Sequence, residues 1–462
     1  MMRLILVFIS LFSLAACQVY KSEIPSNPAG AVPAAFQEDD RGGGRVAPGF
    51  WHAFADPLLN RFEEEALANN QTIAQAKARL EEAAARSEIA GAGLFPWLNL
   101  KGRAAREKQM SSFGASTGNS YNLSLAAGYE IDLWKRLSSS RSAAELGHKA
   151  AALDLAAART AIAAQVADLY FLIVETQAQL NLSDEMIGSY TDSLERVSKR
   201  YESGLVPALD VYQARQNLLA VQARKPSQEA VYTRAVHGLA VLLGRFPEEF
   251  TLAAPGNMCR PEKLFAAGLP ANLVAARPDI RAALLRLIAA DRQTAAAVAD
   301  RFPTFNLLAE FGRGRIDFGQ VVSDSFWSIA TSALAPIFDA GRRKAEVAAK
   351  RAATMAALAA YRQTVLSAFR EVEDSLTSLA ATRRSLSLLE ERERTASETL
   401  KLAEDRYYQG LSDYLPVLSA QQQYFAVKGE LLAARQQMVS ANITLARAAY
   451  LTGGGPLDRP VE

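Results

Sequence analysis

The stretch RYESGL at residues 200–205 returns as RYYQGL at residues 406–411, an offset of 206 positions (406 − 200). A Phe-Pro step at residues 95–96 returns in the same way at residues 302–303. A repeat of this length is a duplicated half of a protein, since solenoid units are only about 20–50 residues long. We therefore expect two halves of similar fold, in a pseudo-symmetric chain suited to an assembly around an axis.

Each half is expected to contain one very long helix. Residues 136–202 lack proline and are rich in Ala, Leu, Gln, Arg and Glu, and a helix over them would be about 100 Å long. Apolar positions follow a four-three spacing that is typical of a coiled-coil seam. The seam comprises Ile162, Val166, Leu169, Ile173, Thr176, Leu180, Ser183, Ile187, Tyr190, Leu194, Val197 and Tyr201. A weaker version follows 206 residues later, from Ala368 to Tyr407.

Both long helices are predicted to stop at a Gly-Leu pair, where a second helix begins. These second helices should run to about Leu243 and about Leu451. Glycine supplies the left-handed residue that a tight helix end needs, so Gly204 and Gly410 mark the tips of two helical hairpins.

Two strand hairpins precede the long helices. Residues 121–133 alternate between apolar and polar or small side chains, as do residues 98–105 across a predicted loop at 111–120. Residues 305–312 and 326–334 repeat the pattern in the second half. Strands of about ten residues can cross a bilayer at a tilt, although a soluble sandwich edge is the alternative.

Four strands cannot close a membrane barrel, and an open edge in lipid leaves backbone groups unpaired. If the strands span a membrane, the chain must form oligomers. Two copies would give an eight-stranded barrel, whose interior is filled by side chains. Three copies of four strands give a twelve-stranded barrel, which can enclose a channel. We expect a homotrimer.

The N-terminus has the layout of a secretory signal. Arg3 precedes an apolar run at residues 4–14, and residues 14–17 read Leu-Ala-Ala-Cys, similar to the bacterial lipobox. Cys17 is then the lipidated first residue of the mature protein. By resemblance to the sorting rules of such lipoproteins, the lack of Asp at Gln18 favours the outer membrane. The alternative is cleavage just before an incidental cysteine. Triacylation would anchor the chain firmly to outer-membrane lipid.

The charge balance is close to neutral, with 51 basic and 49 acidic residues, so we expect no nucleic-acid partner. With Cys17 lipidated, Cys259 is the only other cysteine, and no intrachain disulfide framework is possible.

The three histidines, His52, His148 and His237, are far apart and lack metal-ligand spacing. No Ser-His-Asp arrangement or phosphate loop is evident. We expect neither an enzyme nor a metal site, and no cofactor besides the covalent lipid on Cys17.

Four further segments carry a family resemblance. ARPDIRAA at residues 276–283, RFP at 301–303, EIDLW at 130–134 and PIFDAGR at 336–342 resemble the TolC-like outer-membrane efflux factors, in their lipoprotein (OprM/NodT-type) branch. The resemblance covers roughly residues 50–455.

That resemblance implies a mainly α fold with a small transmembrane β part: a trimeric twelve-stranded β-barrel, with four strands per chain, continuous with a twelve-helix periplasmic α-barrel. It implies a passive duct whose tips open in an iris-like movement on contact with a periplasmic adaptor protein and an inner-membrane pump of the RND type. A lipid-anchored periplasmic coiled-coil scaffold without a pore is the alternative.

The implied domains follow the duplication. They are a signal peptide (1–16), an extended lipidated tether (17–50), a first repeat (51–244), an equatorial linker (245–270), a second repeat (271–452) and a C-terminal tail (453–462).

By resemblance, Gly204, Leu205, Gly410 and Leu411 are the tip residues that contact the adaptor. The side chains expected to pack just behind them are Val211, Tyr212, Ala214, Val417, Leu418 and Ala420.

The same resemblance places a periplasmic gate in the second hairpin. Leu415 matches a constricting leucine, but Ser419 occupies a position that is acidic in related channels, and Gln422 one that is basic. A ring of serines would not favour cations as a ring of carboxylates would. Asp210 and Asp413 could supply acidic rings instead, or could be solvated helix-start caps.

Overall fold

A computed structural model describes residues 20–36, 49–111, 114–250, 276–315 and 325–449. The predicted signal peptide, Cys17, Cys259, residues 251–270 of the predicted linker and the C-terminal tail lie outside the described residues. The chain divides into two compact units. The first contains the sheet with residues 78–154 and 279–364, and the second contains residues 155–278 and 365–462 with residues 32–77.

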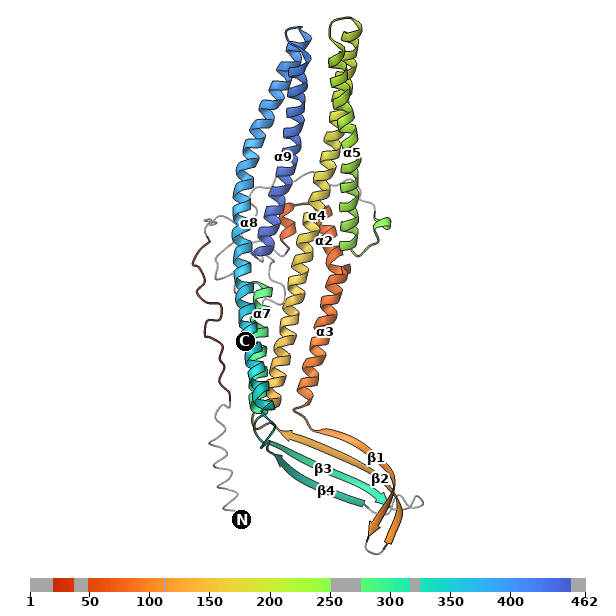
Figure 1. Cartoon of the computed structure of the whole chain (residues 1–462), viewed down its shortest axis with the longest axis vertical. Coiled ribbons are helices and arrows are strands. Elements are labelled where there is room, and N and C mark those ends of the chain that lie inside the picture. The colour runs from red at the N-terminus through yellow and green to blue at the C-terminus, as the bar shows by residue number, and fades with distance from the viewer. Residues whose placement is uncertain (1–19, 37–48, 112–113, 251–275, 316–324, 450–462) are drawn as a thin grey trace. The chain divides into compact units, whose positions relative to one another are not determined.

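The first unit is built on one antiparallel sheet, in the order β1-β2-β3-β4 (Figure 1). The strands are β1 (Trp97–Ser111), β2 (Gly114–Ile131), β3 (Thr304–Arg315) and β4 (Ser325–Leu334). Strand β2 pairs with β3, so the hairpins from the two halves of the sequence form a single sheet.

The loop predicted over residues 111–120 is wrong, because most of it is strand. Strands β1 and β2 have 15 and 18 residues, against 12 and 10 in β3 and β4. Their register continues from Trp97 opposite Gly128 to Ser111 opposite Gly114. The Ser, Thr and Gly residues suggested a turn, but cross-strand pairing satisfies their backbone groups equally well, and Thr favours strands.

Strands and helices of the first unit are joined by specific contacts. Asp132 accepts hydrogen bonds from the backbone N–H groups of Leu137 and Ser138 (2.9 and 2.8 Å), which caps helix α4 (Arg136–Glu202). Trp134 stacks on Phe302 with centroids 4.9 Å apart and donates a hydrogen bond to a backbone carbonyl. This junction explains why EIDLW and the Phe-Pro step are distinctive in the sequence.

The N-terminal segment contacts helices in the first unit. The Tyr20 hydroxyl donates to Asp291 (2.6 Å) on α7 (Pro278–Ala299), and Glu23 pairs with Arg351 (3.2 Å) on α8 (Arg342–Tyr408). The segment predicted as a tether is therefore held against this unit at Tyr20 and Glu23.

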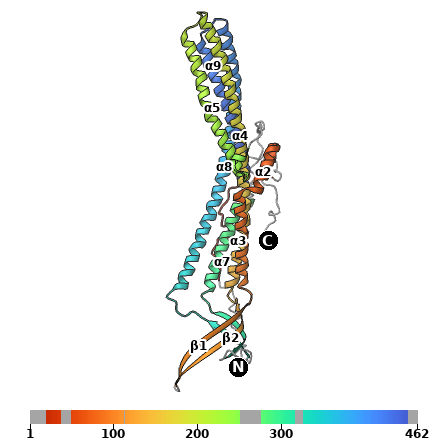
Figure 2. The same cartoon turned by 90° about the vertical axis from the view of Figure 1, so that its right-hand side faces the viewer.

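The second unit is helical and contains both hairpins (Figure 2). Its elements are η1 (Phe50–Phe54), α2 (Pro57–Asn69), part of α3 (Gln71–Ala92), most of α4, α5 (Ala208–Leu242), η2 (Pro247–Glu249), part of α8, and α9 (Tyr414–Ala448). The bounds of α8 and α9 are those of α4 and α5 shifted by 206 positions (342 − 136; 414 − 208). The duplication therefore holds to the residue in the hairpins.

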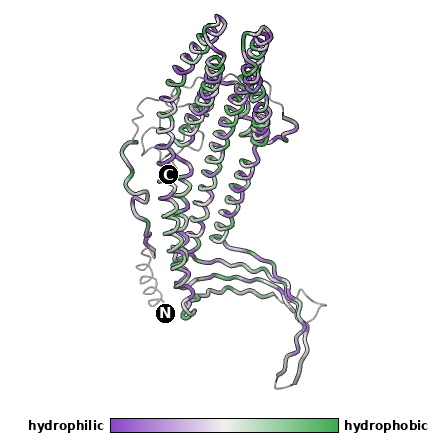
Figure 3. The backbone as a smooth tube through the Cα atoms, turned by 45° about the horizontal axis from the view of Figure 1, so that its top comes forward, coloured by the Kyte–Doolittle hydropathy of each residue, from purple (hydrophilic) through white to green (hydrophobic). Residues whose placement is uncertain are grey.

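Most residues of the predicted seams are buried or half-buried, and Figure 3 shows hydrophobic residues recurring along the helices. In α4, Val166, Ile173 and Val197 are buried, whereas Tyr201 at the end of the seam is exposed. The α8 seam is only half-buried between residues 382 and 403, where the sequence pattern is weaker. Apolar burial at this spacing is what keeps such long helices paired.

Candidate functional site

One face of the sheet is apolar and exposed. Leu100, Leu125, Phe311 and Trp327 lie directly opposite one another across all four strands, and their exposed fractions range from 45% to 74%. The neighbouring row places Leu98 and Ile329 at its two ends, with exposed fractions of 68% and 69%. A soluble sheet buries its apolar face against a core, so this arrangement is typical of strands that face lipid.

The opposite face is mostly polar, although it also carries Trp97, Leu308 and Phe326. Asn99, Ala126, Glu310 and Ser328 form one row across the sheet, and Ser124 donates a 2.6 Å hydrogen bond to Glu310. Among the described residues, β1 and β4 each pair with one strand, so the sheet has two open edges. Open edges in an apolar environment leave backbone groups unpaired at a cost of several kcal/mol each, which requires a partner strand.

The hairpin tips are built on two glycines. Gly204 and Gly410 have φ angles of 73° and 74°, a conformation that glycine adopts without steric cost. Leu205 donates its backbone N–H to the Arg200 carbonyl and Leu411 to the Arg406 carbonyl, both at 2.9 Å. This is the pattern of a Schellman helix end, and it is the same in both hairpins.

Apolar side chains at the tips project into solvent. Leu205, Leu411 and Leu415 are 67%, 65% and 61% exposed, and Leu209 is exposed as well. Exposed apolar groups gathered at one end of a bundle are typical of a protein-binding surface. The structure thus places all four predicted tip residues at the ends of the hairpins.

Behind the turns, the two hairpins pack together in a tip cluster of Val197, Ala214, Tyr407, Tyr414, Val417 and Leu418. Val211 packs against it and Ala420 is buried. The expectation that Tyr212 packs here is wrong, because its side chain is 68% exposed. On α5 the buried residue of this turn is Ala214, and Tyr212 points to another side of the helix.

Arg200 joins the end of α4 to the end of α8. Its guanidinium lies 4.5 Å from the centroid of the Tyr407 ring and donates to the Tyr407 backbone carbonyl (3.1 Å). The Tyr407 hydroxyl and Arg200 Nε are buried with no hydrogen-bond partner among the described residues. Such buried groups without partners cost about 1–3 kcal/mol each, which reduces the net stability of this contact.

The two acidic tip residues predicted from the sequence interact. Burial raises the pKa of Asp210, and the nearby Asp413 carboxylate raises the pKa of Asp210 further. Asp210 lies in the first turn of α5, and Asp413 is the N-cap residue of α9, where its side chain makes no capping hydrogen bond. The structure therefore brings together carboxylates from two different hairpins.

The other predicted gate residues form a stripe on α9. Leu415, Ser419 and Gln422 follow an i, i+4, i+7 spacing and are exposed, on a face separate from the buried tip cluster. Gln422 donates to Asn217 of α5 (2.9 Å).

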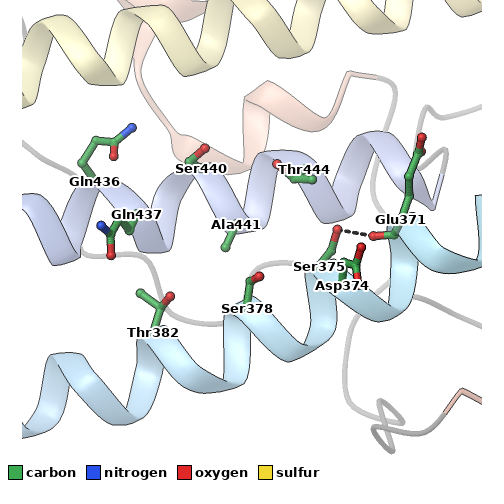
Figure 4. A pocket seen from close by; sticks show the side chains of 10 residues that line it. All are labelled: Glu371, Asp374, Ser375, Ser378, Thr382, Gln436, Gln437, Ser440, Ala441 and Thr444. Atoms are coloured by element: carbon green, nitrogen blue, oxygen red, sulfur yellow. Dashed lines mark hydrogen bonds between the residues drawn. The ribbon is translucent and has the colours of Figure 1, made fainter.

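A polar cavity that the sequence reasoning missed lies between α8 and α9. Figure 4 shows Ser378 and Thr382 of α8 and Gln437 and Ala441 of α9 pointing into a space of about 520 Å³. Ser375 donates to the Glu371 carbonyl (2.6 Å) at one end of it. Ser and Thr at seam positions of α8 are too small to fill the space, and their weak fit to the heptad pattern was the available signal.

Comparison with known proteins assigns the chain to a family. Residues 63–245 and 269–449 match the family model described as outer membrane efflux protein. The chain belongs to the outer membrane efflux protein family. The two matched ranges lie one in each half of the duplicated sequence.

Several curated members of the outer membrane efflux protein family resemble the chain over most of their length. The pyoverdine export outer membrane protein OpmQ of Pseudomonas putida is 30% identical over 97% of each sequence. The solvent efflux pump outer membrane protein SrpC of Pseudomonas putida is 33% identical over 91% of this chain and 90% of its own. The chain is therefore an outer-membrane efflux channel protein.

Solved channels share its fold. The outer-membrane channel OprN superposes with a TM-score of 0.88 at 26% identity, covering 94% of this chain and 98% of its own. The open state of the Neisseria gonorrhoeae channel MtrE gives a TM-score of 0.83 at 27% identity, covering 94% and 97%. The mainly helical fold with a small sheet, predicted from the sequence, is confirmed.

Two further observations concern helix α4 and metal binding in this efflux protein. By length and composition α4 could cross a membrane, but 56% of its most apolar stretch is buried inside the protein. Within the described parts of the chain, no group of three or more His, Cys, Asp or Glu residues is placed to hold a metal ion.

Proposed function

We propose that this protein is the outer-membrane duct of a tripartite efflux system, in which three copies form one passive channel. The observation that carries the proposal is the row of Leu100, Leu125, Phe311 and Trp327 on one exposed face of a sheet with two open edges. Pairing β4 of one copy with β1 of the next would close both edges. Three copies of four strands then give a twelve-stranded barrel, wide enough for a channel.

The hairpin tips are proposed to be the docking surface for a periplasmic adaptor and, through it, an inner-membrane pump of the RND type. Gly204, Leu205, Gly410 and Leu411 would meet the adaptor, since the leucines expose apolar area that association would bury. The cargo would be selected by the pump, and the duct would conduct it passively.

Opening is proposed to occur at the same tips. The stripe of Leu415, Ser419 and Gln422 would line the periplasmic end, with Leu415 as a hydrophobic constriction. Asp210 and Asp413 would supply acidic rings that give a weak preference for cations, because carboxylates from three copies would lie around one axis. Loss of the Arg200–Tyr407 contact would allow the hairpins to separate.

Cys17 is proposed to carry the lipid anchor, for which the Leu-Ala-Ala-Cys sequence is the support. Labelled palmitate incorporated into the wild-type protein and absent from Cys17→Ala would establish the anchor. Label retained in Cys17→Ala would refute it.

Reconstitution of the purified full-length protein tests the channel. We expect a trimer mass and stepwise conductance in planar bilayers. A monomer or dimer that leaves the bilayer insulating would instead indicate a lipid-anchored coiled-coil scaffold.

The proposed effect of Asp210 and Asp413 on ion selectivity can be tested separately. Asp210→Asn combined with Asp413→Asn should reduce cation selectivity, whereas Asp192→Asn, about 18 Å along α4 from Gly204, should not. Unchanged selectivity in the double variant would show that these carboxylates do not line the path.

A further inference from the structure

A second cavity lies in the helical unit, where α4, α5 and α9 meet. Its volume is about 460 Å³, within the range of about 300–1,000 Å³ that small-molecule sites occupy. Its floor is the buried apolar cluster of Leu182, Tyr190, Val221 and Phe425. The Tyr190 and Phe425 rings meet edge to face, with centroids 5.9 Å apart, so one wall of the cavity is aromatic.

The rim of this cavity is polar, and its side chains come from both hairpins. Gln422 of α9 donates to Asn217 of α5 (2.9 Å), and Ser183 of α4 donates to Gln228 of α5 (2.6 Å). These hydrogen bonds hold the rim in place around the apolar floor. An apolar floor with a few fixed polar groups is the usual composition of a binding site for a small organic molecule.

Arg224 is the only charged side chain among the described residues that line the cavity. No described carboxylate forms an ion pair with it, in contrast to the neighbouring Lys225, which pairs with Asp184. Arg224 and Tyr190 line the same cavity. Burial raises the pKa of Tyr190 to about 12, and the positive charge of Arg224 partly opposes that rise. The cavity therefore offers an aromatic floor and one available cation.

We propose that this cavity binds a small aromatic organic anion, whose ring lies against Tyr190 and Phe425 and whose anionic group pairs with Arg224. Guanidinium binds carboxylates through two parallel hydrogen bonds, and the planar ring buries apolar area against the floor. A neutral ligand would leave Arg224 without a partner, and a cationic ligand would be repelled. The inference concerns binding alone and does not depend on channel function.

Isothermal titration calorimetry of the full-length protein in lipid nanodiscs tests this site, with 2-naphthoate as the probe. Arg224→Gln is expected to weaken binding at least fivefold, whereas Arg224→Lys keeps the charge and should retain most of it. The matched control is Arg215→Gln, which removes an exposed arginine from the same helix outside the cavity and should have no effect. Ala220→Trp places an indole in the cavity and should abolish the binding heat.

Two results would overturn the inference. One is equal affinity of wild type and Arg224→Gln for 2-naphthoate. The other is binding of neutral 2-naphthamide as tight as that of 2-naphthoate, which would assign the space to an uncharged molecule such as a lipid or detergent tail. Arg224 is exposed, so its substitution leaves the core intact, and the test remains decisive even where Ala220→Trp does not fold.

Discussion

Replacing Ile329 by arginine should block membrane assembly, whereas the same replacement at the adjacent Ser328 should not. Ile329 is the fifth residue of the ten in β4 and is 69% exposed on the apolar face of the sheet. Ser328 lies on the polar face, opposite Glu310. The two variants add the same side chain to the same strand, one residue apart, so they differ only in the face that receives the charge.

The expected free-energy effects of the two substitutions differ in size and in sign. An arginine on the lipid face near the middle of a membrane strand costs about 2–4 kcal/mol. At about 1.4 kcal/mol per tenfold change, this lowers the ratio of assembled to unassembled protein roughly 30-fold to 700-fold. Arginine at residue 328 faces the Glu310 carboxylate, and an opposite-charge pair across strands contributes about 0.2–1 kcal/mol in favour of the fold.

Outer-membrane fractions and heat-dependent electrophoretic mobility provide the assay. Wild type and Ser328→Arg should accumulate as a heat-modifiable trimer in the outer membrane, and Ile329→Arg should be lost from that fraction. Normal assembly of Ile329→Arg together with failure of Ser328→Arg would show that the polar face meets lipid, which would refute the assignment of the two faces.

Three further predictions concern the helical unit. Gly410→Ala should destabilise the second tip by about 1–2 kcal/mol, because alanine is strained at positive φ. Gly188→Ala inside α4, where an added Cβ meets open space, should stabilise the helix by about 0.5–1 kcal/mol. Hydrogen exchange should therefore show lower protection at the tip and higher protection in α4, and changes of the same sign would contradict the turn geometry. Glu63 is fully buried, and both of its carboxylate oxygens are without a hydrogen-bond partner among the described residues. Burial raises the pKa of Glu63 well above the ordinary value, so folding favours the protonated form. The free energy of unfolding should therefore fall as the pH rises above the unfolded-state pKa of about 4.3. Glu63→Gln should therefore raise the melting temperature more at pH 8 than at pH 5, and a uniform shift would argue against this protonation. Arg200→Ala should remove the contact with Tyr407. Protection of the last turn of α8 against hydrogen exchange should then fall by about 1–2 kcal/mol. Unchanged protection would exclude a role for this pair in holding the two hairpins together at the tip.

The helices were predictable because their signals are local and periodic. A proline-free stretch with four-three apolar spacing and a glycine at its end determines both the length of α4 and its stop, and the 206-residue repeat then predicts α8 and α9. The strand residues at 114–120, where a loop was predicted, were not predictable in this way. Serine, threonine and glycine are compatible with both turn and strand, and only pairing with the neighbouring strand decides between them.

The features of the candidate sites can likewise be separated into those set by local sequence and those set by tertiary packing. The sequence alone determined the duplication, the hairpin tips at Gly204 and Gly410, and the alternation that makes one strand face apolar. The tertiary structure decided that this face is exposed across four strands, that Asp210 lies near Asp413, and that α4, α5 and α9 enclose a cavity beside Arg224. Spacing along a chain reports which side chains share a face of one element, but which faces meet depends on packing between elements far apart in sequence.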